Sequence, residues 1–134
     1  MLATAPEVAS WTLPCRPMSA FVARRLVRAH LVSWGLGSCC DLAELLVSEL
    51  VTNAVRYACG LVRLRVVVAD GLVRCEVEDG APQLPCPREA ADDEEGSRGL
   101  ALVAGLSRRW GSARTRAGKV VWFEVPVPAL DAAA

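Results

Sequence analysis

Residues 48–58 read SELVTNAVRYA, a stretch in which a helical apolar stripe runs beside two polar side chains. Glu49 and Asn53 are four positions apart, so on a helix they lie on one edge of the stripe and face the same way. Ser38 or Asp41 can cap the beginning of this segment. The pattern predicts an amphipathic helix that ends near residue 58. Its apolar stripe consists of Ala43, Val47, Leu50, Val51, Ala54 and Ala58.

The segments on either side of this helix read as three strands and one more helix. Upstream, residues 8–14 alternate like a short strand, and residues 18–34 carry apolar side chains at helical spacing. Downstream, LVRLRVVVA at 61–69 and LVRCEVEDG at 72–80 are joined by Asp70-Gly71, a strong signal for a β-hairpin.

The last third of the sequence predicts a loop, a helix and a second hairpin. Residues 80–96 read as a loop, and Gly96-Ser97-Arg98-Gly99 then opens a helix over about 100–109. Residues 110–127 close the chain as a hairpin around Ala117-Gly118. The order of the elements predicts an α+β fold: a two-layer sandwich with a mixed, mostly antiparallel sheet and helices on one face.

Length and composition point to one globular domain. The chain has 134 residues, 53% of them hydrophobic, and its 15 basic and 15 acidic side chains cancel. We expect a single domain over 1–134, ordered over about 8–128. The zero net charge argues against direct binding of nucleic acid. No apolar run approaches the roughly 20 residues of a membrane span and the N-terminus shows no export signal, so a cytoplasmic protein without membrane contact is expected.

Six cysteines, at positions 15, 39, 40, 59, 75 and 86, form no CxxC pair and no zinc-module spacing. Reduced thiols that pack as small hydrophobes are the favoured interpretation, with disulfides or zinc as the alternative. All six are therefore expected to be free thiols.

Two polar features interrupt the apolar pattern and are candidates for chemistry. Glu49 and Asn53 offer a carboxylate and an amide carbonyl, hard oxygen ligands that suit Mg²⁺, although helix surfaces often carry such side chains. Asp79 ends an inward strand face, where a carboxylate is costly unless it meets a donor such as the exocyclic amine of a purine. The alternative is a turn, because Asp-Gly is a common turn pair. The rest of that inward face consists of Val73, Cys75 and Val77.

A third candidate is the glycine pair at positions 96 and 99. Glycines ahead of a helix let backbone amides approach phosphate closely, and a helix N-terminus favours anions. A flexible loop before a helix would show the same residues, so this feature is weak on its own.

The order, spacing and placement of the three features resemble the GHKL ATPases, the superfamily that includes gyrase, histidine kinases and MutL. In that pattern an N box with Glu and Asn on a helix precedes a DxGxG box and then a glycine-rich box that opens a helix, in a Bergerat-type ATP-binding fold. The resemblance covers about residues 8–127 and is nearest to the short anti-sigma-factor serine kinases of actinobacterial type. The strings that carry it are SELVTNAVRYA at 48–58, GSRGLALVAGLSRRWG at 96–111 and GKVVWFEVPVP at 118–128.

The resemblance implies roles for individual residues. Asn53 corresponds to the Mg²⁺-binding Asn of the family, and Glu49 to its candidate general base. Asp79 corresponds to the Asp that hydrogen-bonds the adenine amine, so Asp79→Asn is expected to weaken ATP binding by about 1–3 kcal/mol while folding is largely kept. Residues 83–95 correspond to the ATP lid. With ATP and Mg²⁺ as cofactors, the implied nucleotide contacts are Asn53, Arg56, Asp79, Ala81, Gly96, Arg98, Gly99 and Leu100.

The DxGxG box departs from the family pattern. It reads Asp79-Gly80-Ala81-Pro82-Gln83, so both motif glycines are replaced. Pro82 stiffens the turn, and Ala81 adds a methyl group where the backbone meets the base. Arg56 lies one turn from Asn53, within reach of a phosphate. These departures bear on nucleotide affinity more than on the fold.

The sequence leaves three functions open. The first is a serine/threonine protein kinase that phosphorylates a small anti-sigma-factor antagonist and can also hold a sigma factor. The second is a non-catalytic switch in transcription regulation, whose nucleotide state or fold alone controls partner binding. The third is an interaction domain without nucleotide. The retained Glu49 favours the kinase, the changes at 81 and 82 favour the switch, and a homodimer stays open.

Overall fold

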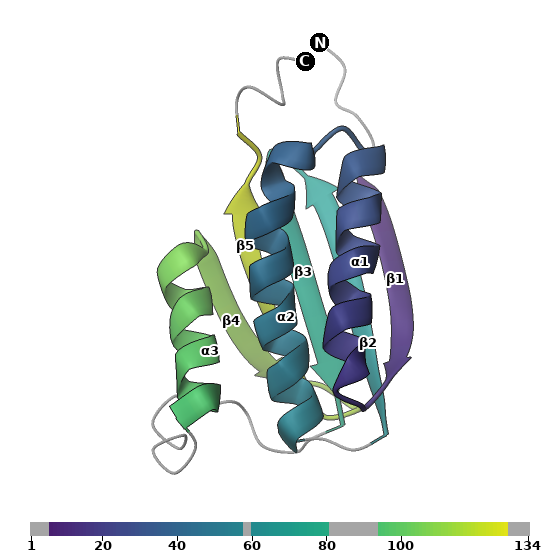
Figure 1. Ribbon diagram of the computed structural model, residues 1–134, viewed down its shortest axis with the longest axis vertical. Coiled ribbons are helices and arrows are strands. Elements are labelled where there is room, and N and C mark those ends of the chain that lie inside the picture. The colour runs from purple at the N-terminus through teal and green to yellow at the C-terminus, as the bar shows by residue number, and fades with distance from the viewer. Residues whose placement is uncertain (1–5, 58–59, 81–93, 129–134) are drawn as a thin grey trace.

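The computed structural model describes residues 6–57, 60–80 and 94–128, except the side chains of Tyr57 and of residues 94–98. Within these residues, one five-stranded sheet is covered on one face by three α-helices (Figure 1). The strands are β1 (Glu7–Pro14), β2 (Leu61–Ala69), β3 (Leu72–Asp79), β4 (Arg109–Arg114) and β5 (Lys119–Pro126). The helices are α1 (Met18–Ser33), α2 (Cys40–Tyr57), which follows a 3₁₀ turn at Gly37–Cys39, and α3 (Glu94–Leu106).

The strands follow the order β1-β2-β3-β5-β4, and each neighbouring pair is antiparallel. This confirms the α+β sandwich with helices on one face; in the described part of the sheet the pairing is antiparallel throughout. The hairpin between β2 and β3 turns at Asp70 and Gly71, which have φ angles of 54° and 75°. Two positive φ angles in a two-residue turn match the twist of the flanking strands, which explains why this Asp-Gly pair sets the register.

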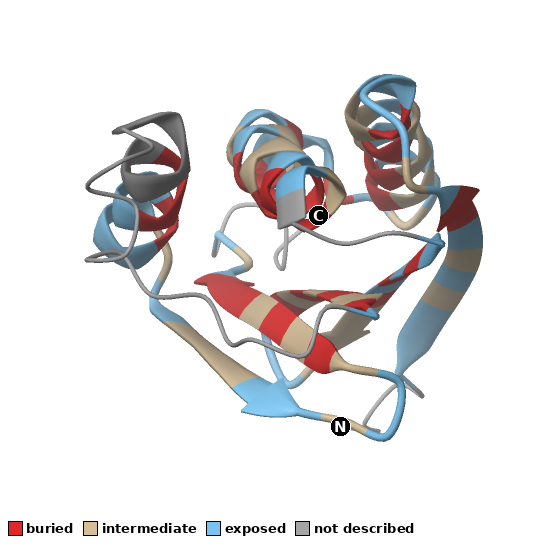
Figure 2. Ribbon diagram, turned by 90° about the horizontal axis from the view of Figure 1, so that it is seen from below, coloured by how far each residue is buried: buried red, intermediate tan, exposed pale blue. Residues whose placement is uncertain are grey.

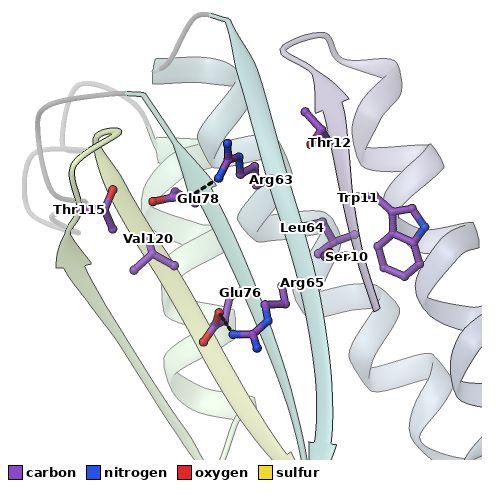
Figure 3. A pocket seen from close by; sticks show the side chains of 10 residues that line it. All are labelled: Ser10, Trp11, Thr12, Arg63, Leu64, Arg65, Glu76, Glu78, Thr115 and Val120. Carbon is purple, nitrogen blue, oxygen red and sulfur yellow. Dashed lines mark ion pairs between the residues drawn. The ribbon is translucent and has the colours of Figure 1, made fainter. Parts of the chain in front are cut away.

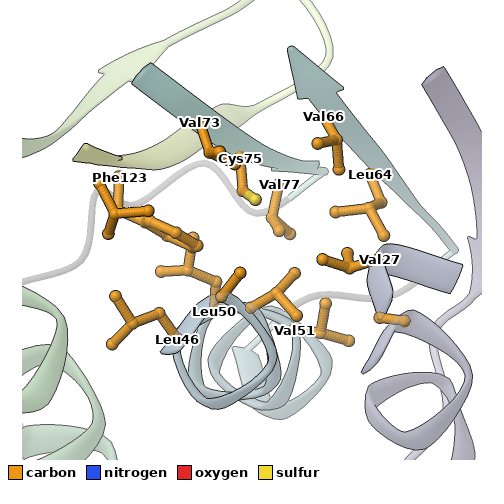
Figure 4. Close-up of a cluster of buried hydrophobic side chains, with 14 of the residues drawn as sticks. Val27, Leu46, Leu50, Val51, Leu64, Val66, Val73, Cys75, Val77 and Phe123 are labelled. Carbon is orange, nitrogen blue, oxygen red and sulfur yellow. The ribbon is translucent and has the colours of Figure 1, made fainter. Parts of the chain in front are cut away.

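The core lies between the helices and the inner face of the sheet (Figure 2). In α1, the buried side chains recur every four residues from Ser19 to Leu31, as an amphipathic helix requires. Side chains from α2 meet those of β2, β3 and β5 in the centre (Figure 4). The central members include Leu46, Leu50, Val51, Leu64, Val66, Val73, Cys75, Val77 and Phe123.

The start of α3 differs from the expectation. The sequence predicted a helix over about 100–109, whereas α3 covers Glu94–Leu106 and Arg109 already belongs to β4. The close packing available to Gly99 against α2 offsets the poor helix propensity of glycine at that position. The glycines at 96 and 99 therefore lie inside the helix rather than ahead of it.

The cysteines agree with the expectation where they are described. Cys15, Cys39, Cys40 and Cys75 are not part of disulfides, and burial raises the pKa of the Cys75 thiol. Positions 59 and 86 lie outside the described residues. In the same part of the chain, no helix has the length and apolarity needed to cross a membrane.

The outer face of the sheet, away from the helices, carries a network of charges around Glu124. This carboxylate is 2.9 Å from Nη1 of Arg74 and 2.7 Å from Nη2 of Arg109. The Arg74 guanidinium also lies 4.0 Å from the centre of the Trp122 ring. Burial alone would raise the pKa of Glu124, but the hydrogen bonds from Arg109 and Arg74 outweigh burial and lower it.

We expect Glu124→Gln to lower the free energy of unfolding at pH 7 by about 1–2 kcal/mol, because the carboxylate accepts three charge-assisted hydrogen bonds from Arg74 and Arg109 and the variant removes its charge. A lowered pKa in the folded state means that Glu124 stabilises the fold above its ordinary pKa of 4.5 and loses this effect as the pH falls. Urea unfolding at pH 7 and pH 3.5 should show the difference shrinking at the lower pH. Glu78→Gln on the same face, whose Arg63 partner is 3.9 Å away, is the matched control and should cost less. A pH-independent loss would contradict the assignment.

Candidate functional site

The C-terminal half of helix α2 holds Glu49 and Asn53 and runs toward the end of the molecule where β3 finishes and α3 begins (Figure 1). Asn53 is buried with 7% of its surface exposed, and Glu49 is half-buried. Thr52 and Arg56 beside them are exposed. Asn53 and Glu49 thus lie where the sequence placed them, on one edge of the apolar stripe, while Arg56 lies at the surface.

Helix α3 brings the glycine-rich segment against Glu49. Gly99 is buried, and a Cβ added to it would lie 2.8 Å from Oε1 of Glu49. A side chain at this position would displace the Glu49 carboxylate, so glycine lets the backbone of α3 lie next to it. Leu100, which is 4% exposed, anchors this turn of α3 in the interior. The structure therefore places the N box and the glycine-rich box side by side, with no room for a side chain between Gly99 and Glu49 as it stands.

Strand β3 ends on Asp79 with the inward phase that the sequence predicted. Residues 73, 75, 77 and 79 are all buried, and the intervening side chains are partly exposed. Asp79 is 2% exposed and forms a buried ion pair with Lys119, whose Nζ lies 3.1 Å from Oδ1 and 2.9 Å from Oδ2. The carboxylate therefore meets a cation of the chain itself.

Lys119 is the residue of this site that sequence reasoning missed. It stands directly opposite Asp79 in the pairing of β3 with β5, and it is 1% exposed. Gly118 makes the close approach of the two strands feasible, because a Cβ there would lie 2.6 Å from the carbonyl carbon of Gly80. The alternation along β5 could have revealed Lys119, because it shares the inward phase of Val121, Phe123 and Val125.

The ion pair changes the result that we expect from one substitution at Asp79. The sequence led us to expect that Asp79→Asn would leave folding largely unchanged. In the structure this substitution would leave the Lys119 ammonium buried without its counter-charge, which costs several kcal/mol. Asp79 therefore contributes to stability as well as being a candidate for base recognition.

The donor set suits a magnesium ion that is shared with a ligand. Asn53 offers a buried amide oxygen, and none of the described residues hydrogen-bonds its side chain. The described residues hold no cluster of three or more His, Cys, Asp or Glu side chains that could bind a metal alone. Mg²⁺ usually takes one or two protein ligands and completes its shell with phosphates and water. Asn53 fits such a partial site.

Several predicted contacts lie outside what the structure describes. Ala81 and most of the expected lid at 83–95 belong to the undescribed residues. Gly96 and Arg98 lie within α3, but of these two only the backbone is described. Their roles stay predictions.

A cavity of about 570 Å³ opens on the outer face of the sheet, away from the helices (Figure 3). Its charged side chains pair across β2 and β3: Arg63 with Glu78 at 3.9 Å and Arg65 with Glu76 at 3.6 Å. None of the predicted site residues lines it. The cavity is therefore separate from the site formed by α2, α3, β3 and β5.

The antiparallel sheet, its helical layer and the polar site at one end are consistent with the class of ATP-binding α+β domains that the sequence predicted. The model of the histidine kinase-like ATPase domain matches residues 13–125, and the chain belongs to this family. The family assignment confirms the GHKL resemblance and implies that the domain binds ATP.

A solved structure supports the same assignment. The chain is similar to the histidine kinase domain of a blue-light activated histidine kinase from Erythrobacter litoralis EL346, with 25% identity and a TM-score of 0.56. The match covers 90% of this chain and 64% of that chain, so this chain spans less than two thirds of that structure. Comparison with curated proteins gives no significant match.

Proposed function

We propose that this domain is a serine/threonine protein kinase of the anti-sigma-factor type, which phosphorylates a small antagonist protein and can also hold a sigma factor. The contact between Glu49 and Gly99 carries the proposal, since it sets a carboxylate beside the helix segment expected to cradle phosphate. A carboxylate in that place can act as a general base, a role that nucleotide binding without catalysis does not require. The site residues are Glu49 as base, Asn53 as Mg²⁺ ligand and Asp79 as adenine acceptor, with Arg56 and Arg98 as candidates for phosphate contact.

The reaction would be an in-line transfer. The hydroxyl oxygen of a partner Ser or Thr attacks the γ-phosphorus, the bond from that phosphorus to the β–γ bridging oxygen breaks, and ADP leaves. Glu49 accepts the proton of the hydroxyl. Asn53 would hold a Mg²⁺ ion from the protein side, and the ion would supply neutralisation of the phosphate charge. The partner supplies the nucleophile, so the domain alone should hydrolyse ATP slowly.

A non-catalytic switch is the second candidate function. The buried ion pair of Asp79 with Lys119 favours it, because the ammonium already neutralises the carboxylate when no nucleotide is bound. The replaced glycines of the DxGxG box point the same way. A switch of this kind would bind its partner through the fold and respond to ATP without transferring phosphate.

Asn53→Ala is expected to abolish the Mg²⁺ dependence of ATP affinity, because the variant lacks the amide oxygen that holds the metal. Calorimetric titration of the protein with ATP, in Mg²⁺ and in EDTA, measures this dependence directly. The thermal midpoint should stay within a few degrees of that of the wild type. Thr52→Ala, which alters an exposed neighbour on the same helix, is the control and should keep the wild-type dependence.

The titration also tests the proposal as a whole. Wild-type protein that binds Mg-ATP supports a nucleotide-dependent function, and protein that binds neither ATP nor ADP would leave only the interaction domain. An unchanged Mg²⁺ dependence in Asn53→Ala would place the metal elsewhere.

A further inference from the structure

Among the described residues, Lys119 is one of the largest side chains that the fold buries completely, and it is the only lysine in the sequence. Moving an ammonium and a carboxylate out of water costs several kcal/mol per ion, and their attraction often returns less than this. Two apolar side chains would continue the inward faces of β3 and β5 at lower cost. Stability alone therefore gives a weak reason for an ion pair at this position.

We propose that Lys119 is a base-reading residue that acts beside Asp79; the inference rests on the nucleotide site of the proposed function. An ammonium has three N–H donors, and Lys119 donates a hydrogen bond to Oδ1 of Asp79. Within the described residues, Asp79 is the one acceptor recorded for it. Although the ammonium is buried, its remaining N–H donors would face a ligand acceptor that enters next to the Asp79 carboxylate.

Adenine presents the complementary pair of groups on one edge. Its exocyclic amine is a donor, and the neighbouring ring nitrogen N1 is an acceptor. Asp79 accepts from the amine while Lys119 donates to N1, so both partners of the ion pair contact the base. Guanine in the same orientation would present its O6 to the carboxylate and its N1–H to the ammonium. The pair then disfavours guanine at two atoms, whereas Asp79 alone would do so at one.

The strand register makes this arrangement rigid. Asp79 and Lys119 face each other across neighbouring strands, and the backbone of Gly118 packs against Asp79 and Gly80. Groups fixed on paired strands keep their spacing when a ligand binds, so the order of acceptor and donor along the base edge is set by the sheet. This rigidity gives the pair the means to discriminate between bases.

The test compares ATP with two analogues on the wild-type protein. In 1-deaza-ATP a C–H group replaces N1, and in 7-deaza-ATP a C–H group replaces N7 on the other ring. If Lys119 donates to N1, calorimetry should show 1-deaza-ATP binding at least about tenfold more weakly than ATP. 7-deaza-ATP should bind with an affinity close to that of ATP. This arm needs no variant and so does not depend on how well a variant folds.

Lys119→Met then assigns the effect to the residue. This variant should bind ATP and 1-deaza-ATP equally, and its preference for ATP over GTP should shrink. Arg109→Met, which removes a cation from the outer face of the same sheet, is the matched control and should keep the wild-type ratio of ATP to 1-deaza-ATP.

The outcomes distinguish failure of the role of Lys119 from failure of the proposed function. Wild-type protein that binds ATP and 1-deaza-ATP equally would overturn the role of Lys119 and leave the proposed function standing. Tighter ATP binding by Lys119→Met would also overturn it, since Lys119 would then compete with the base for Asp79. Wild-type protein that binds no ATP would overturn both.

Discussion

Glu49→Gln is expected to lower the rate of phosphoryl transfer to a partner hydroxyl by about 10²–10⁴-fold, the range that a positioned general base contributes. Glutamine has nearly the same shape, so it can keep the packing against Gly99, but it cannot take up the proton of the attacking hydroxyl. ATP affinity should stay near the wild-type value. The measurement is transfer of label from γ-labelled ATP to a candidate antagonist protein that carries an exposed Ser or Thr, with calorimetric ATP titration beside it.

Glu44→Gln provides the control for that measurement. Glu44 is a carboxylate on the same helix, its side chain is 21% exposed, and its partner is Arg28 rather than the glycine-rich segment. It should transfer phosphate at the wild-type rate. Equal transfer by Glu49→Gln and wild type would remove Glu49 from the reaction. If ATP binds tightly and no candidate antagonist is labelled, the switch replaces the kinase.

Breaking the buried ion pair should have the largest effect on stability. Asp79→Leu or Lys119→Met alone is expected to lower the free energy of unfolding by about 3–5 kcal/mol, because either change leaves one buried charge without its partner. The double variant should recover most of this loss, since two apolar side chains continue the core of β3 and β5 at little cost. Urea unfolding of the four proteins without nucleotide completes the double-mutant cycle.

The outer face of the sheet supplies a matched cross-strand pair for this cycle. Arg63 and Glu78 are also opposite each other, but the Arg63 side chain is 72% exposed, so Arg63→Met should cost less than about 1 kcal/mol. Losses from Asp79→Leu and Lys119→Met that simply add in the double variant would show that the two charges do not stabilise one another.

The local pattern of the sequence was sufficient to predict much of the fold and the placement of Glu49, Asn53 and Asp79 in the candidate site. The alternation along β3 predicted that Asp79 points inward, and the spacing of four between Glu49 and Asn53 predicted that they share a helix edge. Asp70-Gly71 predicted the hairpin because the required positive φ angles depend on the turn residues alone. These features follow from helical and strand periods, which the chain carries without reference to distant residues.

The extent of α3 was the part of the fold that local signals misplaced. Two glycines at 96 and 99 indicate a loop when they are considered by themselves. The structure continues the helix through them, and Gly99 packs against a carboxylate from another helix. Tertiary packing therefore outweighed a propensity cost of about 1 kcal/mol per glycine.

Sequence alone determined that Glu49, Asn53 and Asp79 are polar residues within apolar faces. The alternation along β5 carries the same information for Lys119. Only the tertiary structure decided which of them meet. Asp79 and Lys119 are 40 positions apart, and their contact exists because β5 inserts between β3 and β4 with one register and because Gly118 allows close approach. Glu49 and Gly99 meet for a similar reason, through the packing of α3 on α2. Periodicity specifies the direction of a side chain relative to its own element, whereas the partner it finds depends on how separate elements pair and pack.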